Sequence, residues 1–110
     1  TVLTNKPLES TLAILQGLKI RDRFRFVYGG NSFEQKKPHP VGIKKILKDT
    51  RTPKNRALIV GDSRIDIATG QNAQIASCGV TYGLASNSLS KCNPQFLIRD
   101  LRELPPIILG

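Results

Sequence analysis

The sequence is poor in the residue types on which several classes of protein depend. It has two cysteines, Cys78 and Cys92, one histidine, His39, and neither tryptophan nor methionine. Two unpatterned cysteines are too few for a disulfide framework, and with a single histidine they offer no zinc site. Unpaired thiols are typical of a reducing compartment, so we expect a cytoplasmic protein.

Long apolar runs are also missing. No stretch approaches the length that spans a bilayer, and no secretion signal is visible, so we expect no membrane association. The chain opens at Thr1 without an initiating methionine, and the segment 1–4 already has the pattern of a strand. We therefore expect the natural protein to begin further upstream and this chain to be a fragment of it.

Acidic residues are scarce. Eight acids against 17 lysines and arginines leave a net charge of +9 and a pI near 10.1, and such a surface concentrates phosphate-bearing partners. The excess lies mainly in segments 19–25 and 44–56, which is typical either of a solvated helix face and loop or of a nucleic-acid-binding module. An aromatic content of 5% and the lack of a stacking or groove-reading motif disfavour nucleic acid.

The order of local patterns predicts an α/β domain. A length of 110 residues fits one domain, 1–110, with a real core. Strand and helix patterns alternate, which favours a layered architecture with a parallel sheet. We expect strands at 1–5, 24–28, 57–60, 75–80 and 96–98, helices after Pro7 and Pro40 and over 65–73, a turn-rich stretch at 87–94, and a last helical turn at 101–104 that Pro105 and Pro106 end.

The most informative motif joins an apolar strand to two carboxylates. Residues 57–60 are followed by Gly61 and Asp62, and Asp66 comes one helical turn later on the same side. The carboxyl ends of parallel strands are where open α/β sheets bind ligands, and Mg²⁺ is usually held by one or two carboxylates. The alternative is ordinary helix capping, by an aspartate or by Ser63.

Two further polar clusters follow strands or their loops, at 4–6 and at 36–38. The hydroxyl of Thr4 and neighbouring backbone N–H groups suit a phosphate oxygen, and the ammonium of Lys37 neutralises an anion. Taken singly, Thr4 and Asn5 are also typical of a turn, and Lys37 of a solvated loop. Together with the carboxylate pair they predict a phosphoryl-transfer pocket.

With these motifs, nearly the whole chain resembles the haloacid dehalogenase superfamily of phosphatases, and within it the phosphoglycolate phosphatases. The matching segments are Leu3-Thr4-Asn5-Lys6-Pro7, Gly29-Gly30, Lys36-Lys37-Pro38-His39-Pro40, Val60-Gly61-Asp62-Ser63-Arg64 with Asp66-Ile67, and Gly79-Val80-Thr81-Tyr82-Gly83. The resemblance implies a doubly wound, Rossmann-like parallel sheet and Mg²⁺-dependent hydrolysis of a small phosphorylated metabolite, 2-phosphoglycolate, to glycolate and phosphate.

The resemblance also assigns roles to residues. It implies that Thr4 and Lys37 are catalytic, that both bind the substrate phosphate with the help of Asn5, and that Asp62 and Asp66 bind Mg²⁺. The family's Asp-x-Asp nucleophile motif does not precede Thr4, and its mobile cap is also missing. In the family the nucleophile strand lies centrally, so we expect the sheet to be incomplete and to need an upstream segment of the same protein.

Two other functions stay open at this point. The first is the basic nucleic-acid-binding module raised by the charge. The second is a catalytically silent remnant of the phosphatase fold that serves as a binding partner.

Overall fold

The computed structural model describes residues 1–81, 89 and 91–109, and its strands form two separate parallel sheets. Strand β1 (Val2–Leu3) pairs with β2 (Val27–Tyr28). In the second sheet β4 (Ala76–Val80) lies between β3 (Leu58–Gly61) and β5 (Phe96–Ile98). Every pairing is parallel, which confirms the α/β expectation.

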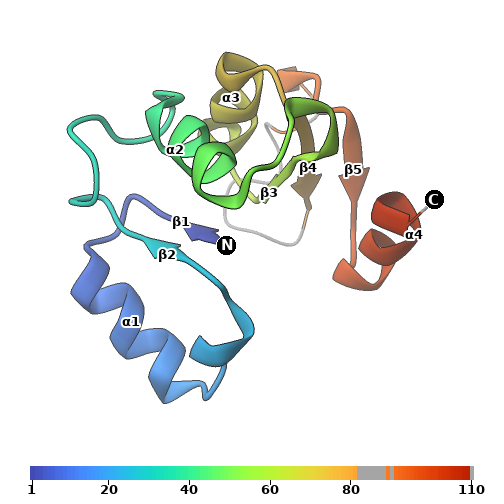
Figure 1. Ribbon diagram of the computed structural model, residues 1–110. Helices are drawn as coiled ribbons and strands as arrows, with labels where there is room; N and C mark the ends of the chain where they lie inside the picture. Colours follow the sequence, from blue (N-terminus) through green and yellow to red (C-terminus); the bar gives the residue numbers. More distant parts are fainter. Residues whose placement is uncertain (82–88, 90, 110) are drawn as a thin grey trace.

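Helices connect the strands and pack beside them (Figure 1). Helix α1 (Leu8–Gly17) joins β1 to β2, and its periodic leucines place Leu15 in a buried position. Helix α2 (Val41–Thr50) begins after Pro40, and α3 (Arg64–Ala73) joins β3 to β4. Because α2 and α3 contact each other, they link the two sheets.

The core centres on β4. Cys78 and Val80 are buried with Ile98, and the partly buried Leu58 packs against them. Burial raises the pKa of the Cys78 thiol, because the thiolate loses its hydration. The last strand is an edge, as expected, and Leu97 on it is 46% exposed. Among the described helices the longest have ten residues, too few to cross a bilayer.

Three expectations about elements were wrong. The strands expected at 1–5 and 24–28 are only Val2–Leu3 and Val27–Tyr28, because the two pair with each other over just two positions, and a 3₁₀ turn over Arg21–Arg23 precedes the second. Pro105 and Pro106 do not end a helix. They lie in the first turn of α4 (Leu104–Leu109), which follows a 3₁₀ turn over Leu101–Glu103, and a first turn has no need of their N–H groups. Residues 82 and 83 of the segment 79–83, and residues 87, 88 and 90 of the turn expected at 87–94, fall outside the described residues.

Candidate active site

The candidate site is built around a direct contact between Lys37 and Asp66. The ammonium Nζ of Lys37 lies 2.6 Å from Oδ1 of Asp66, and the two side chains are only 12% and 11% exposed. Lys37 belongs to the loop after β2, whereas Asp66 lies in the first turn of α3. The ion pair therefore brings together two of the sequence-predicted residues, 29 positions apart, from segments that follow different sheets.

Asn5 holds the backbone of Lys37 in place. Its Nδ2 donates to the carbonyl of Lys37 at 3.1 Å, and its Oδ1 accepts from the Lys37 N–H at 3.0 Å. The next residue is fixed from the other side, because Asn72 of α3 donates to the carbonyl of Pro38 at 2.9 Å. The loop that carries the lysine is thus bound both to the end of β1 and to α3.

Asp66 also serves as a cap at the start of α3. Its Oδ2 accepts from the N–H and the hydroxyl of Ser63, at 3.4 and 3.2 Å. The capping alternative is therefore observed, but alongside the ion pair rather than instead of it. Gly61 makes this close packing possible, because a Cβ at that position would overlap the carboxyl group of Asp66.

Thr4 lies beside the same loop. It lines a small cavity together with Asn5, Gly30 and Lys37. Its Oγ1 accepts from the N–H of Lys6 at 3.2 Å, so the hydroxyl proton stays available for an anion. A Cβ at Gly30 would overlap the carbonyl of Asn5, and glycine is therefore required for this loop to approach the end of β1.

Asp62 is the second sequence-predicted carboxylate of the site. It directly follows the carboxyl end of β3 and is partly buried. Among residues 1–81, 89 and 91–109, no hydrogen bond or ion pair joins Asp62 to Asp66 or to Lys37. In the same residues no three His, Cys, Asp or Glu side chains gather as a metal-binding group, so the described chain offers a cation two carboxylates at most.

A second polar network supports the start of the loop. The hydroxyl of Tyr28 donates to Oδ2 of Asp49 at 2.8 Å, and Lys45 pairs with Oδ1 at 2.9 Å. Burial and this carboxylate raise the pKa of Tyr28, whereas hydrogen bonds from Lys45 and then Tyr28 lower the pKa of Asp49. The ring of Phe33 packs on Tyr28 at 5.2 Å between centroids. Helix α2 and the loop are thereby anchored to β2.

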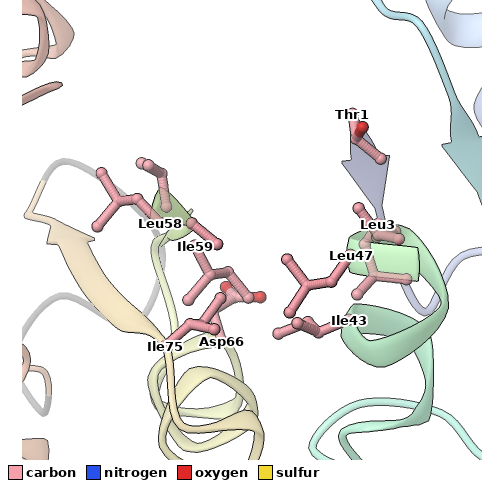
Figure 2. A pocket seen from close by; sticks show the side chains of 11 residues that line it. Thr1, Leu3, Ile43, Leu47, Leu58, Ile59, Asp66 and Ile75 are labelled. Atoms are coloured by element: carbon pink, nitrogen blue, oxygen red, sulfur yellow. The ribbon is translucent and has the colours of Figure 1, made fainter. Parts of the chain in front are cut away.

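A cavity of about 230 Å³ separates the two sheets (Figure 2). Thr1, just before β1, and Leu3 of β1 line one side, and Leu58 and Ile59 of β3 line the other. Asp66 also lines it, so the candidate site opens into this space. The facing edges of β1 and β3 are not hydrogen-bonded to each other.

Sequence reasoning missed Asn72 and the packing role of Gly61. The signal for Gly61 was present, since a glycine stood directly before the first carboxylate at a strand end. Asn72 had no such signal, because its partner carbonyl lies 34 residues away.

Known proteins resemble this chain over most of its length. The family model described as haloacid dehalogenase-like hydrolase matches residues 1–80. A phosphoglycolate phosphatase of Vibrio vulnificus (strain YJ016) is 36% identical over 109 residues, which are 98% of this chain and 48% of that protein. The phosphoglycolate phosphatase of Pseudomonas savastanoi pv. phaseolicola (strain 1448A / Race 6) is 35% identical over 106 residues, 96% of this chain and 39% of that protein.

Solved structures agree with the fold. A crystal structure described as a predicted phosphoglycolate phosphatase from Haemophilus somnus 129PT has a TM-score of 0.91 and 31% identity, covering 96% of this chain and 48% of that one. A haloacid dehalogenase superfamily hydrolase from Geobacter sulfurreducens PCA has a TM-score of 0.84 at 22% identity, covering 97% and 47%, and shows the fold alone. The chain thus spans about half the length of these relatives.

Proposed function

Because the chain belongs to the haloacid dehalogenase-like hydrolase family, we propose that it forms the phosphate-binding part of a Mg²⁺-dependent phosphatase core, a single domain over residues 1–110. The observation that carries this proposal is the 2.6 Å contact between Lys37 and Asp66, with Thr4 and Asn5 packed against the same loop. These residues come from three separate segments, and a solvated loop lysine has no need of such burial.

The site residues have different roles toward a bound phosphomonoester. Thr4 donates its hydroxyl proton to one phosphate oxygen, because its Oγ1 already accepts a hydrogen bond from the N–H of Lys6 and the proton is unused within the described residues. Lys37 has three N–H donors and gives one to Asp66, so the others are free for the phosphate. Asn5 uses both ends of its amide on the backbone of Lys37 and is therefore a positioning residue.

The carboxylates fit a magnesium ion by their chemistry. Mg²⁺ prefers oxygen ligands and is commonly held by one or two carboxylates. Asp62 carries no hydrogen bond or ion pair within the described residues, and Asp66 sits where the site already accommodates a cation at 2.6 Å. These two residues would hold the ion, which when bound supplies positive charge against the phosphate oxygens.

The proposed substrate is 2-phosphoglycolate. Its hydrolysis breaks the phosphorus–oxygen ester bond, consumes one water and releases glycolate and inorganic phosphate. The support is the name shared by relatives from Vibrio and Pseudomonas at 36% and 35% identity. The strong positive charge of the chain also suits a substrate with a phosphate and a carboxylate.

The nucleophile is proposed to come from an upstream segment of the same protein, as a strand between β1 and β3. The cavity of about 230 Å³ lies between these two strands, and apolar side chains line much of it. A strand there would pair with both free edges and join the two sheets into one, removing unpaired N–H and C=O groups. Relatives about twice as long leave ample chain for it.

The test compares variants of the natural protein at its full length. Hydrolysis of 2-phosphoglycolate is measured with Mg²⁺ and after removal of the ion with a chelator. We expect Lys37→Met to lower kcat/KM by about 100-fold or more, because it removes a donor that faces developing negative charge. The exposed Lys19 lies beyond α1, and Lys19→Met is the matched control with unchanged activity. Equal activity of both variants would refute the assignment.

The 110-residue chain alone tests the upstream strand separately. We expect it to be inactive and poorly stable, because the cavity between its sheets is open. Turnover by this chain alone, comparable with that of the full-length protein, would contradict the proposed strand while leaving the phosphatase assignment intact.

A further inference from the structure

We propose that the exposed basic stripe formed by Lys44, Lys48, Arg51 and Arg56 binds the phosphate backbone of a nucleic acid. The first two residues lie on α2, Arg51 caps its end, and Arg56 ends the 3₁₀ turn Lys54–Arg56 before β3. All four are exposed.

Three of these cations follow one another in a row along α2. Positions 44 and 48 are spaced i, i+4 and share one side of the helix, and Arg51 follows at the C-cap, where a left-handed backbone ends the helical spacing. Ile43 and Leu47 line the cavity between the sheets instead. The row from Lys44 to Arg51 runs about 10 Å along the helix axis, more than a single phosphate group occupies.

Neighbouring acids compensate only a small part of the charge of the stripe. Within the described part of the chain, none of its four side chains forms an ion pair or a hydrogen bond. The segment 44–56 contains one acid, Asp49, and both oxygens of that carboxylate are bound, by Lys45 and Tyr28. Asp49 also interacts electrostatically with Lys48, so the stripe keeps an excess of positive charge for a partner rather than four wholly uncompensated charges.

A cavity lies at one end of the stripe. It measures about 250 Å³ and is lined by Arg51, Thr52, Pro53 and Arg56. Guanidinium groups present planar, paired N–H donors that match phosphate oxygens. The stripe thus has an anchoring pocket for one phosphate and lysines for the phosphates that follow.

This surface is separate from the proposed active site. Arg56 precedes the start of β3, whereas Asp62 follows its end. At about 3.3 Å per residue, the four residues of that strand alone keep the two regions more than about 10 Å apart. A nucleic acid on the stripe would therefore leave the phosphate pocket at the other end open.

The chemistry of the stripe predicts binding without base recognition. The segment 41–56 contains no aromatic residue on which a base could stack. Its contacts would be to phosphates alone, which gives weak affinity and a strong dependence on salt.

The experiment measures fluorescence anisotropy of a labelled 15-nucleotide oligouridylate with the full-length natural protein, titrated at several salt concentrations. For four phosphate contacts to a single strand, the slope of log K against log salt is expected near −3. In the double variant Arg51→Gln/Arg56→Gln, the slope should become shallower by about 1.4 and the affinity at low salt should fall at least fivefold.

The control removes the same charge elsewhere. Arg23 and Arg25 are exposed and lie next to β2, outside the stripe. We expect Arg23→Gln/Arg25→Gln to bind within twofold of wild type, and Lys44→Gln/Lys48→Gln to reproduce the loss if the arginine variant fails to fold. An equal loss in stripe and control variants would show attraction by net charge only and would overturn the proposal. Failure to bind oligouridylate at low salt would also overturn the proposal. So would a dissociation constant for one homopolymer more than threefold lower than that for a homopolymer of another base.

Discussion

A single methyl group at Gly61 tests the geometry of the candidate site most directly. The glycine ends β3, and a Cβ there would overlap the carboxyl group of Asp66. No described glycine has a positive φ, so the backbone at Gly61 suits alanine. Any cost of Gly61→Ala must therefore come from the contact with Asp66.

The magnitude follows from what Asp66 gives up when it moves. Overpacking of this kind costs about 1–3 kcal/mol, and loss of the bonds to Ser63 at the helix start costs about 0.5–2 kcal/mol. Displacement also stretches the 2.6 Å contact with Lys37. We expect Gly61→Ala to lower the free energy of unfolding by about 2–4 kcal/mol.

The assay is equilibrium unfolding in urea of the full-length protein, with phosphatase activity measured in parallel. Gly17 is the matched control, because a Cβ there has no neighbour within 4 Å and the residue lies in a helix. Gly17→Ala should leave stability unchanged or raise it by up to about 1 kcal/mol. If Gly61→Ala is as stable as wild type within about 0.5 kcal/mol, the packing argument is wrong.

Three further predictions follow from the same contacts. Lys37→Met should lower the free energy of unfolding by about 3 kcal/mol in urea titrations, because a buried carboxylate loses its partner, and an unchanged midpoint would contradict the buried pair. Asn5→Ala should cost about 2 kcal/mol by the same assay for two lost hydrogen bonds, and a cost below about 0.5 kcal/mol would remove its positioning role. Hydrogen bonds from Lys45 and Tyr28 lower the pKa of Asp49 in the folded protein. These bonds therefore stabilise the fold fully at pH values above the ordinary pKa of an aspartate, and this stabilisation is lost as the pH falls through the lowered pKa of Asp49. The stability difference between wild type and Asp49→Asn should be full at neutral pH and vanish in strong acid, as followed by unfolding across pH, and a constant difference would contradict this.

Local patterns were sufficient for most of the elements. Apolar positions such as Leu8, Leu12 and Leu15 recur at helical spacing, and α1 forms over them. Where a neighbour decides the length of an element, local reasoning failed. The strand expected at 24–28 ends up with two residues, because its length depends on pairing with β1.

The sequence by itself determined the alternation of strands and helices, the family motifs and the residue types of the candidate site, because spacing and side-chain chemistry are local properties. Only the tertiary structure decided that Lys37 reaches Asp66, that Asn5 binds the lysine's backbone rather than lying free, and that Gly61 permits the approach. These contacts join residues far apart in the chain. They depend on how the two sheets and α2 pack, and no local pattern encodes that distance.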